Sequence, residues 1–163
     1  MQQDFSQLIE AMYHRDYQFE NQLIQCKRAL KKALSELPKE FTSHFSTHNQ
    51  YHDWRVANVQ WDCLHSRIVL TLQSPIHNTQ IVEITFSNVT VCEIGSVNES
   101  EKTEAFKISN QPDTIYLMLF IKNKIPAYAA HQLSHAYTCI IRLFGSIRIK
   151  IVFSDLSFVV PKP

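Results

Sequence analysis

The sequence predicts an α+β fold in which an N-terminal amphipathic helix, or a pair of helices, packs on a largely antiparallel β-sheet meander. Apolar residues recur every three or four positions over 4–37, which is helical spacing, and alternate with polar residues in short runs after residue 53, which is strand spacing. The length of 163 residues is that of one ordinary domain. We expect a single domain over 1–163, with a helical segment (4–37), a polar connector (38–53) and a β-rich region (54–160).

The helical segment has a candidate N-cap at Asp4 and ends before Pro38, which cannot continue a helix. Arg15 and Asp16 interrupt its apolar stripe, so one long helix with a polar notch and two separate helices both remain open. We expect the stripe to cover the sheet; the alternative is a coiled-coil seam between two copies, which would make a homodimer. The stripe consists of Phe5, Leu8, Met12, Phe19, Leu23, Cys26, Leu30, Ala33 and Leu37.

The connector holds three histidines spaced four residues apart, His44, His48 and His52, around Phe41 and Phe45. On a helix the imidazoles would stack along one side, where two of them could hold a divalent transition metal. However, no HExxH pattern is present and no cysteine is close by. We therefore expect a loop or a short surface helix without a bound metal.

Alternation in the β-rich region defines which side chains point into the core. Residues 115–121 are apolar on both faces, which predicts the most central strand of the fold. Further strands are expected over 137–143, 146–153 and 156–160. The inward residues are predicted to be Ile68, Leu70, Leu72, Val82, Ile84, Phe86, Ile147, Ile149, Ile151 and Phe153.

Two features of this region bear on binding. One of the two tryptophans, Trp54 and Trp61, is expected to pack in the core, and only an exposed one would mark a contact surface. The polar segment 95–112 carries three acids, Glu99, Glu101 and Glu104. It is interpreted as a solvated hairpin loop, with a short strand over 106–108, that can also meet a basic partner.

Composition argues against several functional classes. The chain has only two glycines, so it cannot build a glycine-rich phosphate loop or a dinucleotide fingerprint. Its 16 basic and 15 acidic residues create no global field for nucleic acid or an anionic membrane. We find no secretory signal and no apolar run of roughly 18 residues, and we expect a cytoplasmic protein with four reduced cysteines.

No arrangement typical of catalysis is present. His131, His135 and Cys139 are spaced four residues apart, but on a strand His135 and Cys139 share a face that we expect to be apolar, and no nucleophile elbow surrounds them. We therefore expect no enzymatic activity and no cofactor. The alternative is a metal-dependent enzyme or regulator that uses His131 and His135 or the three connector histidines.

The strand sequences WRVANVQWDC, RIVLTLQ, ITFSNV and IKIVFSDLSF resemble, in style, small bacterial α+β proteins, some of which are immunity proteins of secreted or contact-delivered toxins. The resemblance implies a cytoplasmic protein that binds and neutralises one toxin domain without a cofactor. Against a nuclease toxin with a basic cleft, it implies that acids replace the displaced phosphates. The acids assigned to this contact are Glu99, Glu101, Glu104 and Asp113.

Overall fold

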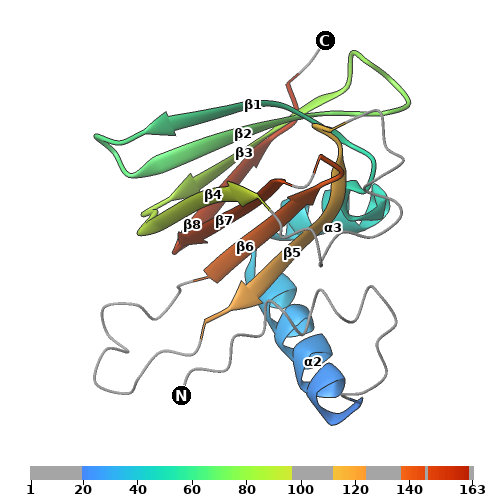
Figure 1. Cartoon of the computed structure of the whole chain (residues 1–163), viewed down its shortest axis with the longest axis vertical. Coiled ribbons are helices and arrows are strands. Elements are labelled where there is room, and N and C mark those ends of the chain that lie inside the picture. The colour runs from blue at the N-terminus through green and yellow to red at the C-terminus, as the bar shows by residue number, and fades with distance from the viewer. Residues whose placement is uncertain (1–19, 97–111, 124–136, 146, 162–163) are drawn as a thin grey trace.

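The computed structural model describes residues 20–96, 112–123, 137–145 and 147–161, and shows an α+β fold with two helices before an all-antiparallel set of strands (Figure 1). The helices are α2 (Glu20–Glu36), α3 (Lys39–Thr47) and the 3₁₀ turn η2 (Asn49–Tyr51). The strands are β1 (Arg55–Asp62), β2 (Arg67–Gln73), β3 (Ile81–Ser87), β4 (Val91–Ser96), β5 (Ile115–Lys122), β6 (Tyr137–Leu143), β7 (Ile147–Phe153) and β8 (Asp155–Val159). The predicted fold class is confirmed, whereas the start of the helical segment and the strand expected over 106–108 lie outside the described residues.

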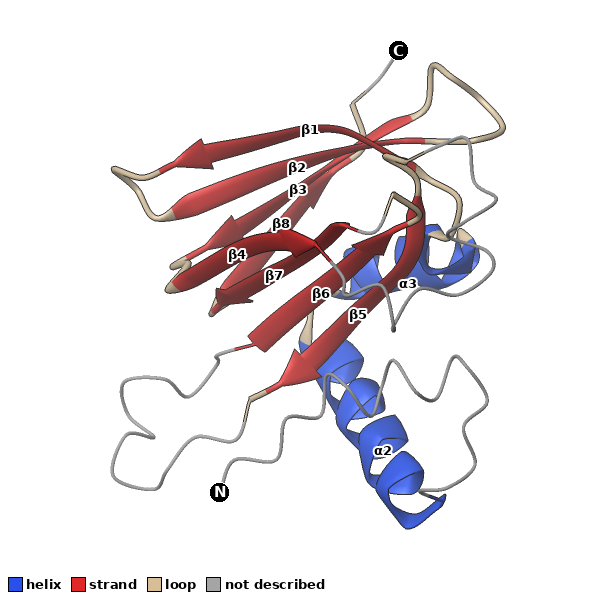
Figure 2. Ribbon diagram, viewed as in Figure 1, coloured by secondary structure: helices blue, strands red, loops and turns tan. Residues whose placement is uncertain are grey.

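The strands form two four-stranded sheets, in the orders β1-β2-β3-β8 and β4-β7-β6-β5 (Figure 2). The two sheets are joined at two places where the chain passes from one to the other, from β3 into β4 and from β7 into β8. The antiparallel pairing continues across this bend, because β3 pairs with β8 in the first sheet and β4 pairs with β7 in the second. At the bend, the amide of Ser154 donates to the carbonyl of Ser87, and Thr90 donates to Val152. Asn88 lies at this corner with a φ of 52°, a conformation that Asn tolerates better than most residues.

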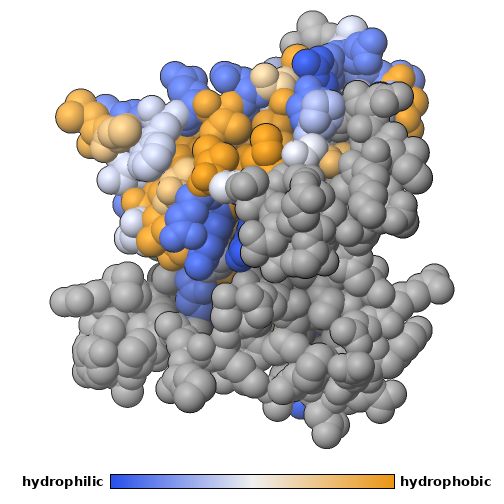
Figure 3. Space-filling model, viewed as in Figure 1, coloured by the Kyte–Doolittle hydropathy of each residue, from blue (hydrophilic) through white to orange (hydrophobic). Residues whose placement is uncertain are grey.

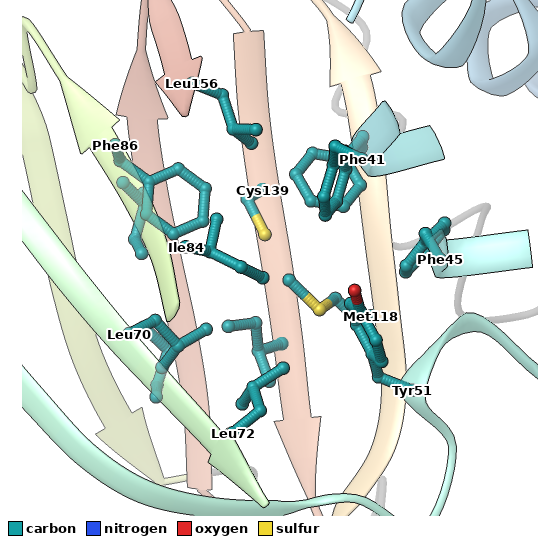
Figure 4. Close-up of a cluster of buried hydrophobic side chains, with 14 of the residues drawn as sticks. Phe41, Phe45, Tyr51, Leu70, Leu72, Ile84, Phe86, Met118, Cys139 and Leu156 are labelled. Carbon is teal, nitrogen blue, oxygen red and sulfur yellow. The ribbon is translucent and has the colours of Figure 1, made fainter. Parts of the chain in front are cut away.

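The core lies between the two sheets, where the predicted alternation is confirmed. Leu70 of β2 and Ile84 of β3 point toward Cys139 of β6 and Met118 of β5 (Figure 4). Phe120 and the inner side chains of β7 belong to the same buried cluster. Ile147 was also predicted to point inward, but at the first position of β7 it is 38% exposed. The buried inner-face residues are Ile68, Leu70, Leu72, Val82, Ile84, Phe86, Cys139, Ile141, Ile149, Ile151 and Phe153.

The prediction that residues 115–121 form the most central strand is wrong. Among the described strands, β5 lies at the edge of its sheet, beside β6. Its lack of alternation reflects cover on both faces: one faces the core, and the other, with Leu117, Leu119 and Ile121, packs against Leu30 of α2. An apolar run in a strand therefore indicates that both faces of the strand are covered. It does not indicate whether the strand lies at the centre or at the edge of its sheet.

α2 covers the outer face of β5 and β6, as predicted for the helical segment. Its C-terminal end is tied down by Glu36, whose carboxylate accepts hydrogen bonds from Lys122 (2.8 Å) and Tyr137 (2.9 Å). The hydrogen bond from Lys122 is the main cause that lowers the pKa of Glu36. Burial, followed by the contact with Glu36, raises the pKa of Tyr137 to about 12. No described helix is long and apolar enough to cross a membrane.

The predicted polar connector contains a core helix. Phe41 and Phe45 of α3 are buried, and the ring of Phe41 packs edge-on against Phe120 of β5 (5.3 Å) and Phe158 of β8 (5.8 Å). α3 therefore bridges the two sheets where β5 and β8 meet it. The polar residues that dominate the composition of this segment lie on the outer side of the short helix.

Candidate functional site

Of the four acids predicted to meet a partner, Asp113 lies in the described part of the chain. Glu99, Glu101 and Glu104 lie outside the described residues. The carboxylate of Asp113 accepts a hydrogen bond from the guanidinium of Arg55, and its carbonyl accepts one from the amide of Val56. Asp113 therefore helps to join the start of β1 to the start of β5, where Ile115 also donates to Trp54 (2.8 Å).

Two of the connector histidines stack on α3, as their spacing predicts. The ring centroids of His44 and His48 are 3.9 Å apart, with a tilt of 23°. Both Nδ1 atoms are engaged, because that of His44 lies 2.8 Å from the hydroxyl of Tyr51 and that of His48 lies 2.8 Å from the carbonyl of His44. Burial, with a smaller contribution from His48, lowers the pKa of His44, and burial raises the pKa of Tyr51.

These histidines do not meet further metal ligands in the part of the chain that is described. His52 lies beyond the end of the helix, with its Nδ1 3.0 Å from Asp53 Oδ2. Within the described ranges, no group of three or more His, Cys, Asp or Glu side chains is placed to hold a metal ion. His131 and His135 lie outside those ranges.

The chain after α3 adopts a left-handed turn that no pattern in the sequence indicates. Asn49, Gln50, Tyr51 and Asp53 all have positive φ, between 50° and 68°. Such a conformation is unfavourable for residues other than glycine, and least so for Asn and Asp. The buried ring of Tyr51, which packs against Trp54 (4.9 Å) and Phe45 (5.4 Å), holds the turn in place.

The left-handed turn forms one wall of a pocket, called here the turn pocket, with a volume of about 130 Å³. Strand β5 forms the opposite wall near its bulge at Tyr116. His52 contributes an aromatic ring that lies 6.0 Å from the ring of Tyr116. The described lining residues are Asn49, Gln50, His52, Tyr116, Leu117 and Met118.

A second feature is an apolar margin where the inner faces of the two sheets reach the surface. Trp61 lies opposite the buried Ile68, and Ile94 lies opposite the buried Ile149, so both side chains continue the core-facing rows. Nevertheless, Trp61 is 54% exposed and Ile94 is 61% exposed. Ile147 shares the face of Ile149, two residues away. We call the three exposed members of these core-facing rows, Trp61 of the first sheet and Ile94 and Ile147 of the second, the apolar rim. Figure 3 shows that apolar side chains are present over the strands on the face in view.

The β1–β2 turn next to Trp61 is fixed by a local polar network. The carboxylate of Asp62 accepts hydrogen bonds from the amide of His65 and from the guanidinium of Arg67 (3.0 Å), and lies 2.8 Å from the ring Nδ1 of His65. Leu64, at the tip, is 89% exposed. The prediction that one tryptophan packs in the core is confirmed, because Trp54 is only 3% exposed. Trp61 is thus the exposed tryptophan, the one expected to mark a contact surface.

Comparison with known proteins identifies no family. No protein-family model matches the sequence, and no curated protein matches it. Among solved structures, the chain is similar to the "crystal structure of an uncharacterized protein from Neisseria gonorrhoeae", with 18% sequence identity and a TM-score of 0.45. The match covers 66% of this chain and 91% of that one. A similarity at this level carries no inference about function.

Proposed function

We propose that this protein works by binding another protein, and that the apolar rim is the centre of the contact. The observation that carries the proposal is the exposure of Trp61, a side chain of a core-facing row that is nevertheless 54% exposed. Tryptophan is among the residues most enriched at the energetic centres of protein interfaces, because a large ring is desolvated when the partner docks. The partner is expected to present an apolar surface.

Two further features support binding rather than catalysis at this surface. The Asp62 network holds the neighbouring turn in one conformation, which reduces the entropy lost when a partner docks. The turn also carries Leu64, so that an additional apolar side chain projects beside the rim. Neither the rim nor the turn contains a nucleophile paired with a base in the described residues.

The specific function we propose is that of a cytoplasmic immunity protein, which binds a toxin domain and blocks it. The support for this class is the resemblance of the strand sequences to small bacterial immunity proteins, together with a rigid scaffold that has an exposed apolar contact. Glu99, Glu101 and Glu104 are proposed as a second, acidic contact that speeds association with a basic toxin. Under this proposal the protein needs no cofactor.

The test first isolates the partner by pull-down of the tagged protein co-expressed with its neighbouring genes, and then measures binding with the two purified proteins. Trp61→Ala should weaken binding by roughly 2 kcal/mol, about thirtyfold, if Trp61 is an energetic centre. Ile76→Ala is the matched control, because Ile76 is 81% exposed but lies in the β2–β3 loop, away from the β1–β2 turn. Unchanged affinity in Trp61→Ala would rule out the rim as the contact.

The immunity class is tested separately by toxicity. Cells that express the toxin domain should survive when this protein is co-expressed and should lose that protection with Trp61→Ala. Survival with Trp61→Ala at equal expression would contradict the role of the rim. A partner whose activity is unaffected by binding would contradict the immunity class while leaving the binding function in place.

A further inference from the structure

The first strand of the fold has an open backbone edge. Among the described strands, β1 lies at the edge of its sheet and pairs with β2 on one side. On its other side, the amide of Val56 donates to the carbonyl of Asp113 (2.9 Å), and the amide of Ile115 donates to the carbonyl of Trp54 (2.8 Å). A short antiparallel ladder therefore begins on this outer edge, and among the described residues it stops at Val56.

The backbone groups that could continue this ladder belong to Val59 and Trp61. Successive residues of a strand direct their N–H and C=O groups to opposite edges. The amide of Val56 points to the outer edge, and the bulge between Val56 and Asn58 adds one residue, so the next outward groups are those of Val59 and then Trp61. The amide of Gln60 points to β2. The outer edge thus offers two N–H donors and two C=O acceptors, repeated about 7 Å apart.

This edge lacks most of the features that prevent an edge strand from pairing with another chain. Natural edge strands are commonly short, covered by another element, or protected by Lys or Pro. β8 has five residues and its Phe158 packs against α3, while the outer face of β5 packs against α2. β1 has eight residues without Lys or Pro, and its bulge lies near its start, before the open part of the edge. Ala57, Asn58, Gln60 and Trp61 are exposed.

The core-facing side of β1 shows what an added strand would cover. Val59 and Trp61 share this side; Val59 packs partly against the core, whereas Trp61 is largely exposed. Side chains directly opposite each other on neighbouring strands contact each other. A strand on the outer edge of β1 would therefore place one side chain beside the ring of Trp61, and the polar Asn58 and Gln60 would remain on the opposite face.

We propose that the protein partner docks by adding an extended segment to the outer edge of β1, as an extra strand paired with Val59 and Trp61. An extended backbone presents donors and acceptors in the same alternation and spacing as this edge. The residue of the segment opposite Trp61 is expected to be apolar. The proposal rests on the proposed function, because it specifies how the partner reaches Trp61 of the apolar rim.

The first experiment is amide hydrogen exchange of the labelled full chain, followed by NMR. In the free protein, the amides of Val59 and Trp61 should exchange at least about tenfold faster than the amide of Gln60, which is paired with β2. Slow exchange of both amides in dilute free protein would show that the edge is already occupied and would overturn the proposal. Protection that appears only as the protein concentration rises would assign the edge to a second copy of the chain instead of a partner.

The second experiment repeats the exchange measurement in the complex with the partner isolated by pull-down. The amides of Val59 and Trp61 should then be protected, because both donate to the added strand. A complex that Trp61→Ala disrupts, but in which neither amide is protected, would mean that the partner contacts the ring of Trp61 without strand pairing. That result would overturn the proposal.

A pair of variants at one position separates the backbone from the side chain. Val59→Pro removes the outward N–H, which an edge strand tolerates because no bond to β2 is lost. It should weaken partner binding by at least about tenfold, since its ring also obstructs the incoming strand. Val59→Ala keeps the N–H and should weaken binding by no more than about threefold. Equal effects of the two substitutions would contradict strand pairing. If Val59→Pro does not fold, the exchange measurements on the wild type decide.

Failure of this proposal is distinguishable from failure of the proposed function. If Trp61→Ala loses the partner while Val59→Pro binds it as Val59→Ala does, strand pairing is wrong and the contact through the apolar rim stands. If no partner is recovered, both proposals are overturned.

Discussion

At the scale of single residues, the two glycines of the chain differ in the space around them. A Cβ at Gly145 would lie 2.6 Å from Pro112 Cβ and 2.7 Å from its carbonyl oxygen, whereas a Cβ at Gly95 would meet no atom within 4 Å. Gly145 also donates its amide to Pro112 (3.0 Å), which holds the β6–β7 turn against the segment before β5. Gly145 is therefore needed for a close approach of two backbones.

We predict that Gly145→Ala lowers the free energy of unfolding by about 1–3 kcal/mol, because the added methyl group must displace backbone atoms. Gly95→Ala is the matched control, and should change it by no more than about 0.5 kcal/mol. Urea denaturation followed by fluorescence measures both. Equal effects of the two substitutions would show that the contact with Pro112 does not limit residue 145.

His44 gives the protein a specific dependence on pH. Because its pKa is lowered below the ordinary 6.5 in the folded protein, the unfolded chain binds this proton more readily than the native chain does. Stability from this residue is thus fully present above the ordinary pKa, and is lost as the pH falls from there through the folded pKa. The physical causes are burial and the stacked ring of His48.

We predict that the free energy of unfolding of the wild type falls more steeply between pH 7 and roughly pH 5 than that of His44→Gln, which cannot gain the proton. Denaturation curves at a series of pH values measure the difference. His77→Gln, at an exposed histidine in the β2–β3 loop, serves as a control for general histidine titration. Parallel curves for wild type and His44→Gln would contradict the role of His44.

At the scale of elements, α3 matters more than its length suggests. One buried ring, Phe41, contacts both sheets through Phe120 and Phe158, and also stacks on Phe45 (5.6 Å) within the helix. The helix therefore contributes to the joint between the sheets as well as to their cover. The two sheets are thus held together by the packing of α3 as well as by the chain itself, which runs from β3 into β4 and from β7 into β8.

We predict that Phe41→Ala lowers the free energy of unfolding by about 3–5 kcal/mol, the usual cost of removing a buried phenyl ring. Lys39→Ala, on the exposed side of the same helix, should change it by less than about 0.5 kcal/mol. Thermal and urea denaturation provide the measurement. A small effect of Phe41→Ala would mean that α3 is not part of the cooperative core.

At the scale of the whole molecule, Cys139 reports on the opening of the core. It is fully buried in the middle of β6, and burial raises the pKa of its thiol. A thiol reagent needs a thiolate that it can reach. Cys139 therefore reacts only when the two sheets separate.

We predict that a variant with Cys26→Ser, Cys63→Ser and Cys92→Ser reacts with a thiol reagent at a rate that follows global unfolding, and accelerates with urea. The opposite variant, in which Cys63 is the remaining cysteine, should react rapidly in native buffer because Cys63 is exposed. Fast labelling of Cys139 without urea would show that β6 opens locally.

The sequence by itself determined the antiparallel strands and their inner faces, because alternation at Ile68, Leu70 and Leu72 or Val82, Ile84 and Phe86 depends only on which side of a strand is buried. It also predicted the stacking of His44 on His48 from their helical spacing. It did not place β5 at the sheet edge, since an apolar strand is covered in the same way by a helix as by neighbouring strands.

The candidate sites were decided only by the tertiary structure. Trp54 and Trp61 look alike in sequence, and their exposure differs because one lies where β1 joins β5 and the other lies where the sheets end. The turn pocket depends on positive φ at Gln50 and Tyr51, which local preference opposes and which the burial of the Tyr51 ring enforces. Both sites form where segments that are distant in the sequence come together, and the periodicity of apolar residues along the chain does not predict which segments do so.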